Sequence, residues 1–142
     1  IVYEYIIEMN HIDPDEIIVM GFSLGTGVAS YVSENRDFSQ LVLIAPYSSM
    51  VDVINTRFPI AYGPMKHFIK NQYMTKDRVE NMNEDTLIIA SNDDEIINIK
   101  ISKKLIALLP DAEVHILNTY SHNQLGNNTE TETLVENFLT KE

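Results

Sequence analysis

The sequence predicts an α/β fold, in which a mostly parallel sheet lies between two layers of helices. Four short apolar segments are predicted as strands, at 16–21, 41–45, 86–90 and 113–117. Their apolar residues run continuously instead of alternating with polar ones, which is typical of parallel strands that are covered on both faces. Segments with a helical period separate them, and this alternation of strand and helix predicts a three-layer α/β/α arrangement.

The helices are predicted from apolar side chains that recur every three or four residues. They are expected at 1–10, 23–34, 99–109 and 131–139. Pro14 follows the first helix, and proline disfavours helical backbone at the residue before it. Pro110 ends the third helix in the same way. The long connection at 47–75 contains two further prolines and is predicted to be irregular, with short helical pieces.

Size and charge limit the possible partners. A chain of 142 residues can form one domain with a substantial core. Its formal net charge of −11 argues against nucleic acid, which requires clustered Lys and Arg, and against docking on anionic membranes. The sequence contains no cysteine, which excludes disulfides and thiolate chemistry and fits a reducing compartment. We therefore expect a cytoplasmic protein.

A serine lies where the first strand should turn into a helix. The segment Gly21-Phe22-Ser23-Leu24-Gly25 has the Gly-x-Ser-x-Gly spacing of a nucleophile elbow. Such a sharp turn holds its serine in a strained backbone conformation, and we expect both glycines to lie where a side chain would clash. The Leu24 N–H, at the helix start, can then face an oxyanion beside Ser23. The alternative is a tight turn with an incidental serine.

A base and an acid must follow if Ser23 is a nucleophile, since a serine hydroxyl is weakly nucleophilic until a base removes its proton. After an elbow of this kind the acid and then the histidine come later in the chain. His122 lies on the loop after the last strand and is the expected base. The other histidines, His11, His67 and His115, are expected to be structural or on the surface.

The acid should follow the third strand, where Asp93, Asp94 and Glu95 are consecutive. Composition does not choose between the two aspartates, and the remaining acids of the cluster are expected to be solvated. A metal site is the other interpretation of clustered carboxylates, but the cluster lacks the alternating ligand spacing of a calcium loop. We therefore expect no metal.

These segments resemble the α/β-hydrolase superfamily, and most of all its Bem46-like, alpha/beta-hydrolase-domain serine hydrolases. The matching stretches are 13–29, 41–53, 86–105 and 120–125. The resemblance implies that Asp94 is the acid, because it begins an Asp-x-Ile-Val-Pro-like run, with Ser23 as the nucleophile and His122 as the base. It implies hydrolysis of a small acyl ester or thioester through an acyl-enzyme, which needs no cofactor.

The resemblance covers only the second half of that fold. Residues 1–142 are therefore expected to be the C-terminal part of a single domain, with a cap-like insertion at about 47–75. The first half would supply a second oxyanion N–H and cover the outer edge of the first strand. We expect that half, or a second copy of the chain, to cover this edge, and activity to depend on the missing part.

The cap-like insertion holds the expected substrate-binding residues, Met65, Phe68 and Tyr73. They could line an acyl pocket under a lid, or pack in the core beneath a long connection. Two further functions stay open. A serine peptidase on the same fold is one, because nothing in the sequence separates amide from ester substrates. A non-catalytic binding module is the other, although the complete triad argues against it.

Overall fold

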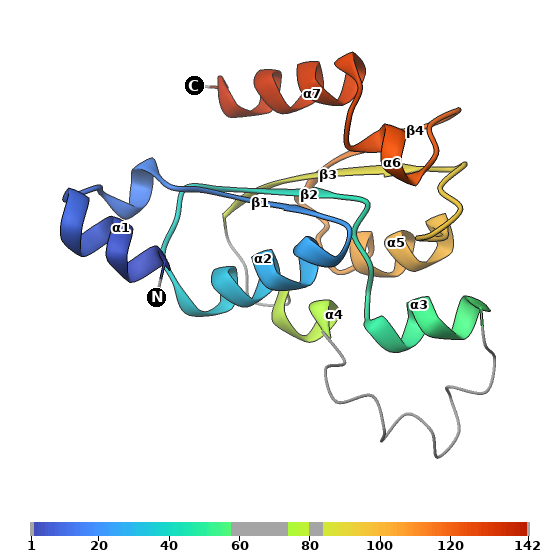
Figure 1. Ribbon diagram of the computed structural model, residues 1–142, viewed down its shortest axis with the longest axis horizontal. Helices are drawn as coiled ribbons and strands as arrows, with labels where there is room; N and C mark the ends of the chain where they lie inside the picture. Colours follow the sequence, from blue (N-terminus) through green and yellow to red (C-terminus); the bar gives the residue numbers. More distant parts are fainter. Residues whose placement is uncertain (1, 58–73, 80–83, 142) are drawn as a thin grey trace.

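The computed structural model describes residues 2–57, 74–79 and 84–141 of the chain. Four strands form one sheet in the order β1-β2-β3-β4, and each neighbouring pair is parallel. Their bounds are Ile18–Phe22, Gln40–Ile44, Asp85–Ser91 and Glu113–Leu117. All four carboxyl ends therefore lie at the same end of the sheet (Figure 1). The predicted α/β fold is confirmed.

The helices cover both faces of this sheet. Their bounds are α1 (Val2–Asn10), the 3-10 helix η1 (Pro14–Glu16), α2 (Leu24–Asn35), α3 (Met50–Arg57), α4 (Thr75–Arg78), α5 (Ile99–Ile106), α6 (His122–Leu125) and α7 (Thr129–Leu139). Helices α2, α4 and α5 lie on one face of the sheet and α7 on the other, as Figure 1 shows. In the described part of the chain, no helix is both long and apolar enough to cross a membrane.

Alternate residues of the central strands fill two separate cores. Leu41, Leu43 and Ile88 face the α2 and α5 side, where they pack with Leu105. Val42, Ile44, Leu87 and Ile89 face the opposite side, where they pack with Phe138 of α7. Because β2 and β3 are buried on both faces, their central residues 41–44 and 87–90 are all apolar, as the prediction of a doubly covered parallel sheet requires.

Several element boundaries differ from those predicted. The first strand begins at Ile18 and not at residue 16, because Asp13 and Glu16 form a capping box that closes η1 first. Helix α5 ends at Ile106, three residues before the predicted end. Helix α7 begins at Thr129, since the Asn128 side chain caps it by accepting from the Thr131 N–H. The short helix α6 was not predicted.

Strand β1 has a neighbouring strand on one side only among the described residues. Its residues Ile18, Met20 and Phe22 face the α7 side, and 42%, 51% and 38% of their surfaces are exposed. We call this strand and its exposed residues the β1 edge. The expectation that another polypeptide covers it, and the assignment of residues 1–142 to part of a larger domain, stay predictions.

Candidate active site

Ser23 lies between β1 and α2 with φ 52° and ψ −120°. A positive φ is uncommon for a residue with a side chain, and it marks a backbone that its surroundings must hold. The Ser23 N–H donates to the Ile44 carbonyl at 2.9 Å. Its carbonyl accepts from the Thr26 N–H at 2.9 Å and from Thr26 Oγ1 at 2.7 Å. These bonds tie the turn to β2 and to the first turn of α2.

The two glycines of the motif have different roles. A Cβ on Gly21 would lie 2.7 Å from the Gly25 carbonyl oxygen and 2.8 Å from Thr26 Cα, so a side chain cannot fit there. This part of the prediction is confirmed. A Cβ on Gly25 meets nothing within 4 Å, so the predicted clash there is wrong. Gly25 supplies the backbone against which Gly21 packs, while its own Cα faces open space.

The side chains of Ser23, His122 and Asp94 form one hydrogen-bonded chain. His122 Nε2 lies 2.8 Å from Ser23 Oγ, and Nδ1 lies 2.8 Å from Asp94 Oδ2. His122 is 4% exposed and Asp94 is 7% exposed. The other oxygen of Asp94 accepts from the Ile96 and Ile97 N–H groups at 2.8 and 2.7 Å. Since an ionised carboxylate only accepts, it holds the imidazole proton on Nδ1 and leaves Nε2 to accept from Ser23.

The loops that carry Asp94 and His122 are bonded to each other at several points. Ser91 Oγ donates to the Tyr120 carbonyl at 2.6 Å, and the Asn92 amide donates to Asn118 Oδ1 at 2.7 Å. Asp93 and Glu95 also take part. Asp93 Oδ2 accepts from the Thr119 N–H at 2.7 Å, and Glu95 Oε2 accepts from the His122 N–H at 2.9 Å. Both side chains are exposed, as expected of solvated acids, but each also accepts a hydrogen bond that the sequence did not predict.

Phe22 lies against the imidazole and Gly126 lies against Phe22, and neither contact was predicted from the sequence. The Phe22 and His122 ring centroids are 5.1 Å apart with an angle of 32° between the planes. A Cβ on Gly126 would lie 3.0 Å from the Phe22 ring, so the missing side chain leaves room for that ring. The only sequence signal was the position of Phe22 beside the serine.

Leu24 is the first residue of the twelve-residue helix α2. N–H groups in the first turn of a helix have no intrahelical acceptor, so the Leu24 N–H is available next to the Ser23 side chain. Its role as an oxyanion donor stays a prediction. The expected substrate-binding residues Met65, Phe68 and Tyr73, and also His67, lie outside the described residues.

The remaining described histidines lie apart from the triad. His115 is half-buried on β4, and its Nε2 lies 2.7 Å from Glu113 Oε1. Lys141 also pairs with Glu113. The hydrogen bond from His115, followed by that from Lys141, holds the pKa of the Glu113 carboxyl below its ordinary value. His11 is exposed on the turn after α1. Both observations agree with the structural or surface roles expected for these two residues.

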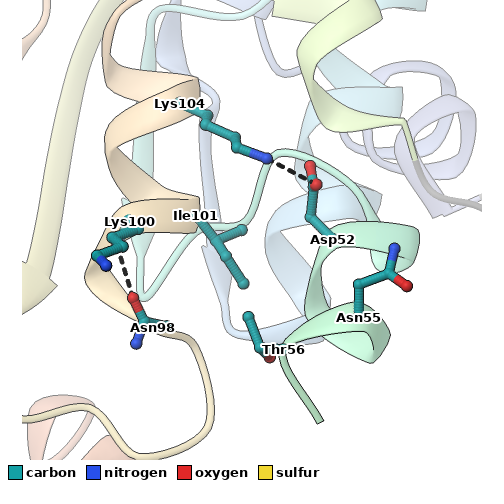
Figure 2. Close-up of a pocket in the computed structure, with 7 residues that line it drawn as sticks. All are labelled: Asp52, Asn55, Thr56, Asn98, Lys100, Ile101 and Lys104. Carbon is teal, nitrogen blue, oxygen red and sulfur yellow. Dashed lines mark hydrogen bonds and ion pairs between the residues drawn. The ribbon is translucent and has the colours of Figure 1, made fainter. Parts of the chain in front are cut away.

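A cavity of about 420 Å³ lies between α3 and α5 (Figure 2). Its lining residues are Asp52, Asn55, Thr56, Asn98, Lys100, Ile101 and Lys104. Lys104 forms an ion pair with Asp52 at 2.8 Å, which neutralises one of the two lysines. The triad side chains are not part of this lining. In the described part of the chain, no group of three or more His, Cys, Asp or Glu is arranged to hold a metal ion.

The fold is similar to that of solved α/β hydrolases. An acylaminoacyl peptidase in complex with a chloromethyl ketone aligns with 99% of this chain and 26% of its own, with a TM-score of 0.76 and 16% identity. The α/β hydrolase enzyme MGS-M2, from a Medee basin deep-sea metagenome library, aligns over 99% and 70%, with a TM-score of 0.74 and 14% identity. An α-beta serine hydrolase homologue from Coxiella burnetii aligns over 96% and 54%, with a TM-score of 0.63 and 20% identity. At these identities the likeness shows the fold.

The curated relatives carry no assigned activity. The uncharacterized protein Rv2307c of Mycobacterium tuberculosis is 25% identical over 114 residues, which are 80% of this chain and 40% of that protein. An uncharacterized protein of Acanthamoeba polyphaga mimivirus is 28% identical over 88% of this chain and 48% of its own. The chain thus spans less than half the length of these relatives. Residues 3–136 match the profile described as "Uncharacterised protein family (UPF0227)", and the chain therefore belongs to the family UPF0227.

Proposed function

We propose that this protein is a serine hydrolase that cleaves a carboxylic ester or thioester through an acyl-enzyme. The observation that carries the proposal is the chain of two 2.8 Å hydrogen bonds from Ser23 through His122 to Asp94. It is the arrangement in which a histidine can act as the base for a serine nucleophile. We also propose that the protein is a Bem46-like hydrolase and that it is cytoplasmic.

In the first half-reaction Ser23 Oγ attacks the substrate carbonyl carbon while His122 Nε2 takes the hydroxyl proton. The carbonyl oxygen becomes an oxyanion, which the Leu24 N–H stabilises by donating a hydrogen bond. His122 then gives its proton to the departing alcohol or thiol, and the acyl group stays on Ser23 as an ester. Asp94 keeps the imidazole oriented and stabilises its charged form throughout.

In the second half-reaction a water molecule replaces the leaving group. His122 Nε2 takes a proton from the water as its oxygen attacks the acyl carbon. The tetrahedral intermediate collapses, the carboxylic acid leaves, and the proton returns to Ser23 Oγ. No step needs an oxidant, a reductant or a metal. An amide substrate could follow the same steps, and the peptidase named among the structural neighbours keeps this alternative open.

A fluorophosphonate probe tests the proposal, because it phosphonylates an activated serine whatever the natural acyl group is. We expect the full-length wild-type protein, including the N-terminal part that the resemblance implies, to be labelled and its Ser23→Ala variant to be unlabelled. His122→Gln should lower the labelling rate by about a thousandfold or more, while the matched control His115→Gln should leave it unchanged. Wild-type protein that does not react, or Ser23→Ala that reacts equally, would contradict the proposal. Hydrolysis rates of an ester, a thioester and an amide with the same acyl group then distinguish the three substrate classes.

A further inference from the structure

Two consecutive acids bind His122 at two different points. Asp94 Oδ2 holds ring atom Nδ1 at 2.8 Å, and Glu95 Oε2 holds the backbone N–H of the same residue at 2.9 Å. We propose that Glu95 is a positioning residue, which fixes the main chain of His122 while Asp94 fixes its ring. This inference rests on the proposed function, since it assigns Glu95 a part in presenting His122 to Ser23.

The main chain of His122 needs a bond from outside its own helix. His122 is the first residue of α6, which has only four residues, and a first-turn N–H has no intrahelical acceptor. The local cap does not reach it, because Gln124 Oε1 accepts from the N–H and Oγ of Ser121. The acceptor for the His122 N–H is instead the Glu95 carboxylate, on the loop after β3. A charged acceptor makes this bond stronger than one between neutral groups.

The segment before His122 carries strain, which makes an anchor more necessary. Thr119 has φ 70°, in the left-handed region that residues with side chains rarely adopt. Asp93 Oδ2 accepts from the Thr119 N–H at 2.7 Å, so one acid holds the strained residue and another holds the end of the segment. Thr119, which Asp93 holds, lies three residues before His122, whereas Glu95 bonds His122 directly.

The geometry explains what the Glu95 bond contributes to the reaction. With its N–H and its Nδ1 both fixed, the imidazole has little freedom about either side-chain torsion. Nε2 is then held 2.8 Å from Ser23 Oγ. If Nε2 moved about an ångström from this position, proton transfer from Ser23 could slow by about a hundredfold. Without Glu95, Asp94 would still set the proton on Nδ1, but the ring could move together with its main chain.

Two substitutions of Glu95 separate the hydrogen bond from the presence of the side chain. Glu95→Ala removes the acceptor, and we expect the rate of fluorophosphonate labelling to fall about tenfold or more. Glu95→Gln keeps an amide oxygen that can accept from the His122 N–H, so its rate should stay within about threefold of wild type. The matched control is Asp111→Ala, which removes an exposed acid from the turn before β4.

Hydrogen exchange of the His122 backbone amide gives a readout that does not depend on activity. We expect exchange to accelerate in Glu95→Ala and to remain slow in Glu95→Gln and Asp111→Ala, with melting temperatures unchanged within about 2 °C. Wild-type labelling rates in Glu95→Ala, or equally slow labelling in Glu95→Gln and Glu95→Ala, would overturn the inference. A wrong proposed function is recognised separately, because wild-type protein would then not label at all. The amide exchange would still report whether Glu95 holds His122.

Discussion

On one side of Ser23 the loops after β3 and β4 are bonded to each other at several consecutive residues, whereas on the other side β1 has no further strand among the described residues. The first side carries the proposed acid and base with the groups that hydrogen-bond to them, and Asp94 and His122 are almost fully buried. The second side offers one predicted oxyanion donor, open space beside Gly25 and the apolar residues of the β1 edge. The described residues thus contain all the groups of the proposed proton transfer, but only part of the surroundings that the proposed substrate carbonyl would need.

The two outer strands of the described sheet, β1 and β4, differ in the polarity of their side chains. Strand β4 carries Glu113 and His115, which pair with each other, and Glu113 also pairs with Lys141. Charged side chains of this kind are a usual protection for a strand at the edge of a sheet. Strand β1 carries Ile18, Met20 and Phe22 instead. We propose that another polypeptide segment, from a longer protein or from a second copy, covers the β1 edge.

The largest expected effect concerns the two neighbouring aspartates on the bonded side. Asp94→Asn should lower the labelling rate by about 10³- to 10⁴-fold, because an amide no longer holds the imidazole proton on Nδ1. Asp93→Asn keeps an oxygen that can accept from the Thr119 N–H, and its rate should stay within about threefold. Rate constants measured with one fluorophosphonate compare the pair. Equal losses in both variants would contradict the assignment of Asp94.

The two glycines of the elbow give the next largest effect and compare the two sides directly. Gly21→Ala places a Cβ against backbone atoms that cannot move aside, so we expect it to destabilise the fold by about 3 kcal/mol. Gly25→Ala places a Cβ in open space within a helix and should be neutral, or stabilising by up to about 1 kcal/mol. Urea denaturation measures both. A large loss in Gly25→Ala would indicate that a segment outside the described residues fills that space.

The smallest effect is expected at the charged edge, where Glu113 has a lowered pKa in the folded protein. A lowered pKa contributes stability above the ordinary pKa of the carboxyl, and this contribution is lost as the pH falls through the folded value. The group is partly exposed, so the contribution is small. Wild type should melt no more than about 2 °C above Glu113→Gln at pH 7, and this difference should shrink as the pH falls below the ordinary range of a carboxyl pKa. A difference that grows with acidity would contradict the sign.

The sequence predicted the features that depend on period and on short-range geometry. Four strands, the main helices and the turn at Ser23 follow from apolar patterning and from a motif whose first glycine is sterically required. The choice between Asp93 and Asp94 did not follow from composition. It depends on which carboxylate turns inward, and the Ile96 and Ile97 N–H groups decide that in the folded loop.

The errors share a physical cause, which is that each depended on contacts between distant residues. Gly25 was expected to be crowded because the motif was considered without knowing what lies beside it. The hydrogen bond of Glu95 was not predicted because its partner, the His122 N–H, comes 27 residues later in the chain. Phe22 and Gly126 meet only when the loop after β4 returns to the end of β1. Local sequence patterns do not predict contacts between residues that are distant in the sequence.

The order of the strands has a consequence for synthesis on the ribosome. Each strand in the series β1-β2-β3-β4 joins the one made just before it, so the sheet can grow in the direction of translation without waiting for a later strand to be inserted. Ser23 leaves the ribosome before His122, which follows it by 99 residues. The nascent chain therefore carries the Ser23 hydroxyl without its His122 partner until all four strands of the described sheet have been synthesised.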